Sequence, residues 1–325
     1  MTAAGLFEPG SLAALAAERV REARRNGALQ SIATELHCID DGGIRFLVRV
    51  LASLKQKQRE AQAQADSNAR GQDRANPFLP HDPRLFVADL TPTHFCLLNK
   101  FNVVDSHLLL VTRAFEDQGR LLTPADLDAM AVVLAEIDGL GFFNGGTAAG
   151  ASQPHKHLQL VPLPLAGEGH GPALPIEPLL APVLAAADLG EPATVPGLPF
   201  RHALLALGGR ADAADLDRGY RRLFAATGLA AADAAVRADA RPAMPYNLLL
   251  TRRWMLIVPR SREQVGGIGV NALGYAGSLF VHDEAQMATV ARTGPLRLIT
   301  EAAVAGAPTA TVPPGGSRRG RIGWT

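Results

Sequence analysis

The sequence predicts an α+β fold in which an antiparallel sheet is flanked by helices. The clearest observation is a hairpin pattern, in which YNLLL (246–250) and WMLIVP (254–259) are separated by three residues. A second pair of strand-like runs, HFCLLNKF (94–101) and HLLLVTR (107–113), is joined by a short turn. Two longer stretches, 124–137 and 212–227, place apolar residues at helical spacing. Hairpins combined with long helices favour α+β over an alternating parallel fold.

The first elements are a helix and a series of strands. Ser11 is an N-cap residue before a helix, and residues 44–52 (IRFLVRVLA) predict a strand. A polar stretch near 55–76 has almost no apolar residues, so we expect it to be mobile. The next three strands are predicted at 85–90, 94–101 and 107–113.

The middle of the chain predicts a capped helix, a loop and a strand. Thr123 and Pro124 open the helix, which we expect to end near Gly139 and Gly141. A glycine-rich loop should follow and lead into a strand over about 155–163. Residues 166–200 are rich in proline, glycine and alanine, which predicts a connector over the surface.

The second half predicts a helix over 212–227 and the hairpin described above. A glycine-rich stretch, a short strand and a last helix follow, at 266–277, 278–281 and 283–293. No internal repeat is recognisable. The resulting division is a catalytic region at 1–165, the connector at 166–200, a region at 201–305 that completes the substrate site, and a flexible tail at 306–325.

Composition excludes several classes of protein. The net charge of +1 gives no reason to expect a nucleic-acid partner. No apolar run approaches the roughly 20 residues that span a bilayer, and the N-terminus lacks a secretory signal pattern. Cys38 and Cys96 are isolated, so neither a disulfide framework nor a thiolate zinc site is expected. These observations predict a cytoplasmic protein without a membrane partner, either a monomer or a small oligomer.

The stretch NGGTAAGASQPHKHLQ (144–159) carries the main functional pattern. On a strand, His155, His157 and Gln159 share one face about 6.5–7 Å apart, and Lys156 faces the other way, where it can reach solvent. The preceding loop is made of small residues, whose backbone N–H groups can approach a phosphate closely. Because this loop enters a strand and lacks Gly-Lys-Ser/Thr, it is not a P-loop. The row suits a phosphate chain.

The residues alone leave three interpretations of the histidine pair open. A metal site would need a third ligand, for which His170, His202 and His282 are the candidates. Both histidines can also be structural residues in a packed interior. The third interpretation makes one imidazole a nucleophile toward phosphorus, because a neutral imidazole is nucleophilic near pH 7.

A wider pattern resembles a known family. GASQPHKHLQ (150–159), residues 76–118, YNLLLTRRWMLIVPRS and VNALGYAGSLFV are similar to the diadenosine tetraphosphate phosphorylases, also called ATP adenylyltransferases. This family belongs to the histidine-triad superfamily, beside the galactose-1-phosphate uridylyltransferases, and the likeness runs from about Phe46 to Leu298. It implies an antiparallel sheet of the histidine-triad and uridylyltransferase type. The implied activity is reversible phosphorolysis of diadenosine tetraphosphate (Ap4A) to ADP and ATP, with ATP, ADP, AMP and phosphate as ligands.

The resemblance also implies roles for individual residues. His157 takes AMP from the substrate, and His155 and Gln159 flank it. Because an amide cannot shuttle protons at neutral pH, Gln159 suits transfer to phosphate better than transfer to water. The implied substrate contacts are Lys57 (with Lys55 as the alternative), Asn99, Asn144, Gly150, Ala151, Ser152, Gln153, Asn271, Ala272 and Leu273. Ser278 and His282 belong to the same set but stand where the fungal pattern has methionine and lysine.

Alternatives remain at several positions. Asn99 can simply cap a turn, and Asn271 can satisfy backbone groups in a glycine-rich loop. We expect a divalent cation, Mg²⁺, to arrive with the substrate polyphosphate, and no metal held by the protein itself. Uridylyl transfer to a sugar phosphate, nucleotide sensing without catalysis and metal-dependent binding are the rival functions. ADP sulfurylase activity, which occurs in the family, is left open.

Overall fold

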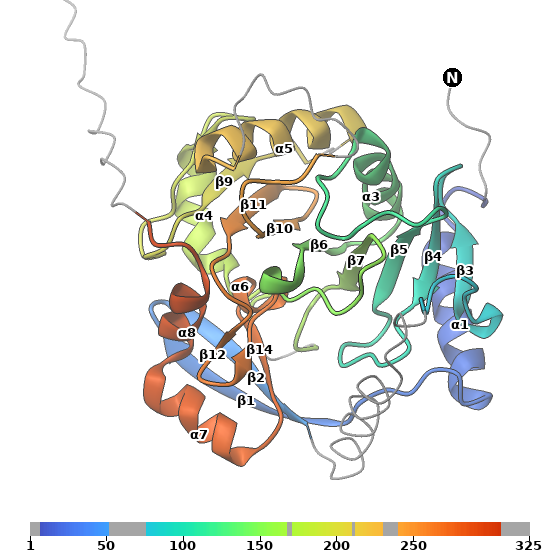
Figure 1. Cartoon of the computed structure of the whole chain (residues 1–325), viewed down its shortest axis with the longest axis horizontal. Coiled ribbons are helices and arrows are strands. Elements are labelled where there is room, and N and C mark those ends of the chain that lie inside the picture. Colours follow the sequence, from blue (N-terminus) through green and yellow to red (C-terminus); the bar gives the residue numbers. More distant parts are fainter. Residues whose placement is uncertain (1–6, 52–75, 168–170, 210–211, 230–239, 307–325) are drawn as a thin grey trace, which may run out of the picture.

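The computed structural model describes residues 7–51, 76–167, 171–209, 212–229 and 240–306. Its centre is a nine-stranded sheet in which every neighbouring pair of strands is antiparallel (Figure 1). The strands, in spatial order, are β3 (Phe86–Asp89), β4 (His94–Leu98), β5 (Leu108–Thr112), β7 (His157–Pro162), β6 (Gly139–Gly145), β10 (Tyr246–Leu250), β11 (Trp254–Pro259), β9 (Ala203–Ala206) and β8 (Pro192–Ala193). The predicted α+β class with an antiparallel sheet is confirmed.

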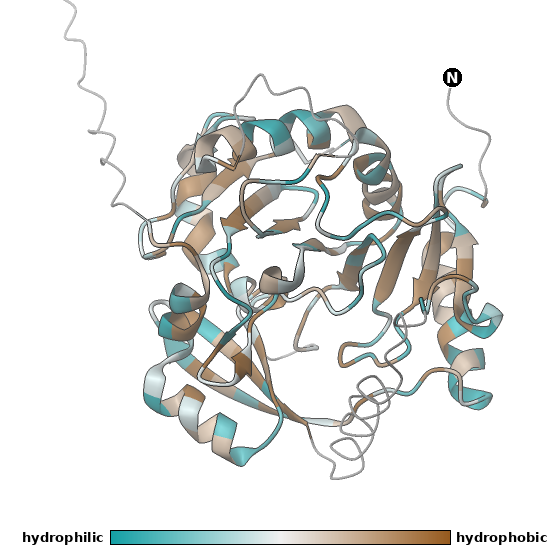
Figure 2. Ribbon diagram, viewed as in Figure 1, coloured by the Kyte–Doolittle hydropathy of each residue, from teal (hydrophilic) through white to brown (hydrophobic). Residues whose placement is uncertain are grey.

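Three helices cover one face of this sheet: α1 (Leu12–Arg25), α3 (Pro124–Glu136) and α5 (Ala213–Thr227). The α3 helix begins where the sequence predicts, with a capping box between Thr123 and Asp126. The α5 helix is capped by Asp212 and ends at Gly228, whose φ of 69° lies in the left-handed region. Figure 2 shows apolar residues along the strands and polar residues on the outer turns of these helices.

The other face packs against a second layer. This layer contains a sheet of β1 (Thr34–Asp41), β2 (Ile44–Leu51) and β14 (Ser278–Val281), and helices α4 (Glu177–Ala186), α6 (Ala272–Tyr275), α7 (Glu284–Thr293) and α8 (Pro295–Ala302). A short hairpin, β12 (Gln264–Val265) and β13 (Ile268–Gly269), and two 3-10 turns, Pro83–Leu85 and Thr147–Ala149, complete the elements. Because β14 pairs in parallel with β2, the C-terminal half closes onto an N-terminal strand.

The large sheet contains a repeat that the sequence does not reveal. Its order β4-β5-β7-β6 is mirrored by β8-β9-β11-β10, and each half carries a helix, α3 or α5, before its inner hairpin. The two halves meet where β6 pairs with β10, from Gly141–Leu250 to Gly145–Tyr246. His157 begins β7 opposite Val111, and Trp254 begins β11 opposite Ala206. Trp254 is therefore the structural equivalent of His157.

Some predicted elements need correction. Residues 139–145, expected as helix end and loop, form the central strand β6. The strand expected from His155 begins at His157, and β1 was not predicted. The connector 166–200 contains α4 and β8. Most of the insertion near 55–76 and of the tail 306–325 lies outside the described residues, and the division into regions remains a prediction.

Candidate active site

His157 is held as a neutral imidazole, and its Nε2 has no hydrogen-bond partner among the residues that the structure describes. Its Nδ1 lies 2.8 Å from the carbonyl oxygen of His155. A carbonyl only accepts hydrogen bonds, so Nδ1 carries the proton and Nε2 keeps its lone pair. Burial lowers the pKa of His157 to about 4, because the side chain is only 3% exposed. This imidazole is the nucleophilic form at neutral pH.

His155 is engaged through both ring nitrogens. Its Nε2 lies 2.8 Å from the carbonyl oxygen of Thr112 and therefore donates, while Nδ1 accepts from Asn76 Nδ2 at 2.9 Å. Burial lowers its pKa as well. The Phe78 ring packs against both His155 and His157, with centroids 5.6 and 5.3 Å away. His155 thus supports His157 through its carbonyl and offers no nitrogen to a metal.

Gln159 belongs to a second hydrogen-bonded row on the same sheet face. Its Oε1 accepts from His107 Nε2 at 2.9 Å, and His107 Nδ1 accepts from Asn99 Nδ2 at 3.2 Å. Burial lowers the pKa of His107 to about 4, so this imidazole is neutral too. Since Oε1 is used by His107, the NH2 end of Gln159 is the end that can donate to a ligand.

The glycine-rich loop is tied to α6 by Asn144. Asn144 Oδ1 accepts from the backbone N–H of Ala272 at 3.0 Å and from Asn247 Nδ2 at 2.8 Å. Gly150, with φ of 87°, packs so closely that an added Cβ would lie 2.7 Å from the Cβ of Asn271. The N-terminal loop and the C-terminal α6 therefore form one structural unit.

The opposite face of β7 carries a buried charged cluster. Lys156 is fully buried, and its Nζ lies 2.7 Å from Glu116, 3.2 Å from Asp126 and 3.1 Å from the carbonyl oxygen of Leu121. Asp126 also accepts from His94 Nε2 at 3.0 Å. The expectation that Lys156 reaches solvent is wrong, because α3 and the segment before it cover this face.

Comparisons with known proteins match this geometry to one family. A sequence model of the Ap4A phosphorylase N-terminal domain matches residues 2–182, and one of the ATP adenylyltransferase C-terminal domain matches residues 196–305. Diadenosine 5',5'''-P1,P4-tetraphosphate phosphorylase 2 of Saccharomyces cerevisiae is 32% identical over 254 residues, which is 68% of this chain and 74% of that protein. The chain belongs to the Ap4A phosphorylase family.

Further comparisons of this Ap4A phosphorylase-family chain also lead to yeast proteins. Protein APA1 of Saccharomyces cerevisiae is 28% identical over 305 residues, which is 85% of this chain and 88% of that protein. The crystal structure of yeast Ap4A phosphorylase Apa2 with AMP superposes with a TM-score of 0.72 at 26% identity, covering 92% of this chain and 99% of that one. The same yeast enzyme with Ap4A gives a TM-score of 0.71 at 25% identity, covering 92% and 98%. The family resemblance predicted from the sequence is confirmed.

The structure of this Ap4A phosphorylase-family chain groups most of the predicted site residues. His155 and His157 form one hydrogen-bonded pair, and Gln159 and Asn99 belong to the second row through His107. Asn144, Gly150, Asn271 and Ala272 form the loop-and-α6 unit, where Leu273 is also buried. The N–H groups of Gly150 and Ala151 are used inside the loop, by the carbonyls of Thr147 and Gly146. Ser152 is exposed, and Gln153 is half-buried.

Other predicted contacts lie elsewhere. Ser278 is buried in β14 opposite Leu47, and His282 is exposed just after that strand. Lys57 and Lys55 fall outside the described residues. Asn99 does accept from the N–H of Phe101, and Asn271 does cap α6 through the N–H of Leu273. The local backbone roles of these two asparagines are thus present, and their substrate contacts remain predictions.

Several residues of the Ap4A phosphorylase-family site have no clear signal in the sequence. They are Asn76, Phe78, His107, Thr112, Gln118, Asn247 and Arg260. Only His107 carries a hint, as a polar residue opening an otherwise apolar strand. The others reach the site through tertiary packing.

No metal centre is evident in the described ranges, which contain no group of three or more His, Cys, Asp or Glu side chains suited to an ion. His202, a candidate third ligand, instead accepts from the N–H of Val195 and contacts the Phe200 carbonyl. His170 lies outside the described residues. Within those ranges, no helix is long and apolar enough to cross a bilayer.

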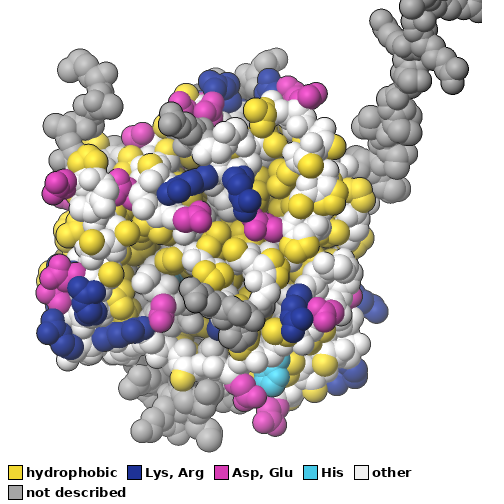
Figure 3. Space-filling model, turned by 180° about the vertical axis from the view of Figure 1, so that it is seen from behind, with side chains coloured by type: hydrophobic (Ala, Val, Ile, Leu, Met, Phe, Trp, Pro, Cys, Tyr) yellow, Lys and Arg dark blue, Asp and Glu magenta, His cyan; other side chains and the backbone are white. Residues whose placement is uncertain are grey.

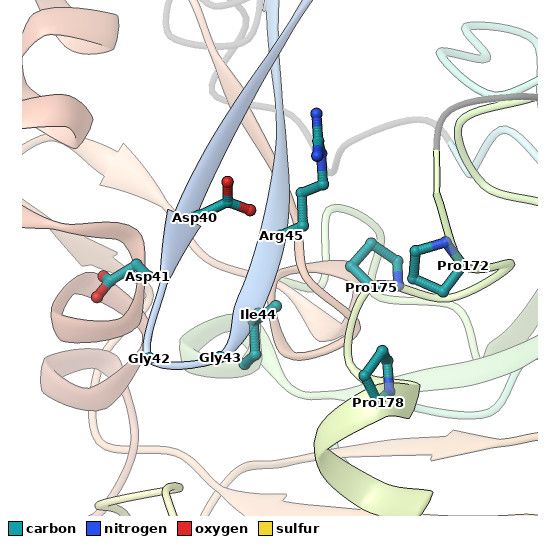
Figure 4. Close-up of a pocket in the computed structure, with 9 residues that line it drawn as sticks. All are labelled: Asp40, Asp41, Gly42, Gly43, Ile44, Arg45, Pro172, Pro175 and Pro178. Carbon is teal, nitrogen blue, oxygen red and sulfur yellow. The ribbon is translucent and has the colours of Figure 1, made fainter.

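The surface of this Ap4A phosphorylase-family chain adds two observations. Figure 3 shows acidic and basic side chains intermingled on one face. A cavity of about 360 Å³ lies beside the β1–β2 turn, and its lining includes Asp40 and Arg45 on one side and Pro172, Pro175 and Pro178 on the other (Figure 4). None of the predicted site residues lines this cavity, so it is separate from the His157 site.

Proposed function

We propose that this protein phosphorolyses Ap4A with orthophosphate, giving ADP and ATP, through an adenylyl group carried on His157. The observation that carries the proposal is the tautomer of a neutral, buried His157, whose Nδ1 donates to the His155 carbonyl and whose Nε2 therefore keeps its lone pair. Family membership and the yeast enzymes named for Ap4A support the choice of substrate.

The chemistry has two displacements that balance. Nε2 of His157 attacks the α-phosphorus, the bond to the bridging oxygen breaks, and ATP leaves. An oxygen of orthophosphate then attacks the same phosphorus, the N–P bond breaks, and ADP is released with Nε2 restored. Both steps are reversible, so ATP and ADP can form Ap4A and phosphate.

The surrounding groups suit each stage of the reaction. The adenylylated ring carries positive charge, and the His155 carbonyl, 2.8 Å from Nδ1, stabilises it. The NH2 of Gln159 donates to a non-bridging phosphoryl oxygen. The nucleotide is bound by a further set of predicted contact residues. They are Ser152, Gln153, Asn99, Asn144 and Lys57. A divalent cation on the polyphosphate and a cytoplasmic location belong to the same proposal.

The direct test is phosphate-dependent cleavage of Ap4A, with the products resolved as ADP and ATP. We expect repeated turnover only when phosphate is present. Without phosphate, Ap4A labelled in the adenylyl group should leave an acid-labile, alkali-stable label on the wild-type protein. His157→Ala should take no label while still binding AMP. His37→Ala, which removes a half-buried histidine on β1, is the matched control and should label normally.

Three results would reject the proposal. They are AMP with ATP as products in place of ADP with ATP, normal labelling of His157→Ala, and nucleotide binding without turnover. Product formation from UDP-glucose and galactose 1-phosphate, with none from Ap4A, would favour the uridylyltransferase alternative.

A further inference from the structure

The β6–β7 ladder stops before the nucleophile although both strands continue. The pairs run from Gly139–Pro162 to Phe142–Gln159. Two residues further in the same register, Asn144 would face His157. Instead, β6 continues by pairing with β10, and β7 continues by pairing with β5 at His157–Val111. The sheet is thus split between its two central strands at the residue that carries the reaction.

The side chain of Gln118 fills this split. Its Oε1 accepts from the N–H of His157 at 2.8 Å. Its Nε2 donates to the carbonyl oxygens of Asn144 at 2.9 Å and His157 at 3.2 Å. The side chain is 2% exposed, so these bonds form away from water. The amide therefore replaces the peptide group that a continuous ladder would supply.

Gln118 is itself anchored beside the site. Its N–H donates to the Pro154 carbonyl at 2.8 Å, and the N–H of Lys156 donates to the Glu116 carbonyl at 2.7 Å. The ion pair between the Lys156 ammonium and the Glu116 carboxylate is a second link between the same two stretches of chain. These contacts fix the backbone that presents Gln118, so its amide is a rigid spacer.

We propose that Gln118 is a positioning residue that holds the β6–β7 hairpin open at His157. Without its amide, the His157 N–H can pair directly with the Asn144 carbonyl. The hairpin then closes, and the imidazole moves relative to the loop that receives the phosphate. A displacement of about 1 Å can lower a rate about 10²-fold. This inference rests on the proposed function and adds a residue that does not touch the reacting atoms.

The test compares Gln118→Met and Gln118→Glu with wild type. Methionine keeps the length and removes every hydrogen bond. A buried glutamate facing two carbonyls has a raised pKa, and once protonated it can accept from His157 and donate to one carbonyl. Tyr220→Phe is the matched control, because it removes buried hydrogen bonds to the Leu122 N–H and Tyr246 without touching the split.

Three quantities are measured for each variant: the single-turnover rate of adenylyl labelling by Ap4A, the dissociation constant for AMP, and the melting temperature. For Gln118→Met we expect a roughly 10²-fold slower rate, with AMP affinity and melting temperature close to those of Tyr220→Phe. Gln118→Glu should regain rate as the pH falls from about 8 to about 5, where His157, with its pKa of about 4, stays neutral. The methionine variant should show no such recovery.

Labelling of Gln118→Met at the wild-type rate would overturn the inference. Equal losses of rate and AMP affinity, or a glutamate variant without recovery in acid, would also do so, because they indicate a purely structural role. Failure of wild type itself to take label would reject the proposed function, and this inference with it.

Discussion

Asn247 Nδ2 donates to Asn144 Oδ1 over 2.8 Å, at the junction where β10 of the C-terminal half meets β6 of the N-terminal half. Asn247 also donates to the Ala149 carbonyl at 2.8 Å and accepts from the buried Arg260 at 2.6 Å. One amide therefore joins the glycine-rich loop, the central strand and a buried charge. The shape of the loop depends on the C-terminal half.

Asn247→Leu should be strongly destabilising. It removes three buried hydrogen bonds at once, to Asn144, to the Ala149 carbonyl and from the Arg260 guanidinium, and puts an apolar side chain against the buried charge, which costs about 3 kcal/mol or more. Urea unfolding measures the loss. Gln264→Leu, an exposed amide of the same half, should change stability by less than about 0.5 kcal/mol. Equal stability of Asn247→Leu and wild type would disprove the linking role.

The rate of labelling should persist into acid. Because burial lowers the pKa of His157 to about 4, the imidazole keeps its lone pair well below pH 6. Single-turnover labelling by Ap4A from about pH 4.5 to 8 should therefore show no loss centred near 6.5. A titration of the rate at that ordinary histidine value would mean that His157 is solvated in the working enzyme.

The free energy of unfolding should decrease as the pH is lowered through the same range. The pKa values of His157 and His107 are about 4 in the folded chain and near 6.5 when exposed, so the unfolded state binds more protons between these values. The two neutral histidines therefore contribute fully to the free energy of unfolding above about pH 6.5. This contribution is lost as the pH falls toward 4, by a few kcal/mol in all. His107→Gln should flatten this slope in equilibrium unfolding. An unchanged slope would refute the assignment.

Lys156→Met should destabilise the fold by about 3–5 kcal/mol, because it leaves the buried Asp126 carboxylate without its cation. Glu116→Gln removes the partly exposed member of the same cluster and should cost about 1 kcal/mol or less. Thermal unfolding compares the two. Similar losses of stability in both variants would show that the buried position of Lys156 does not make its ion pairs more important for stability.

Gln159→His should shift adenylyl transfer toward water. The amide can hold a phosphoryl oxygen but cannot accept a proton, whereas an imidazole can do both. We expect a larger share of AMP relative to ADP when Ap4A is cleaved in the presence of phosphate. Gln159→Glu, which keeps an acceptor for His107 but places a carboxylate against the phosphate, should slow both reactions. An unchanged product ratio in Gln159→His would reject the role of the amide.

The sequence predicted the strands and helices that carry strong periodicity, and it missed β6 for a physical reason. Gly139, Gly141 and Gly145 looked like loop residues. At Gly141 a Cβ would lie 2.6 Å from the Met130 sulfur of α3, and at Gly145 it would lie 2.8 Å from the Tyr246 ring. These glycines allow neighbouring side chains to pack closely against a strand. The local sequence cannot distinguish a glycine of this kind from one in a turn.

The histidine pair and its loop were predicted because their spacing is local. Gln118 was not, because a glutamine in a polar segment gains its role only when residues 39 positions apart meet. Lys156 illustrates the same limit: alternation placed it opposite His157, but the segment that buries it comes from elsewhere in the chain. Tertiary contacts of this kind produce no periodic pattern in the sequence from which they could be predicted.

The equivalence of His157 and Trp254 limits how many covalent adducts one chain can carry. Trp254 is fully buried, and its indole N–H donates to Glu177 of α4 at 3.3 Å. The duplicated architecture therefore has a mirror position filled by a buried indole, which is not a nucleophile. On the proposed mechanism, a chain saturated with substrate should therefore hold one AMP, on His157 and not at the equivalent position of the second half.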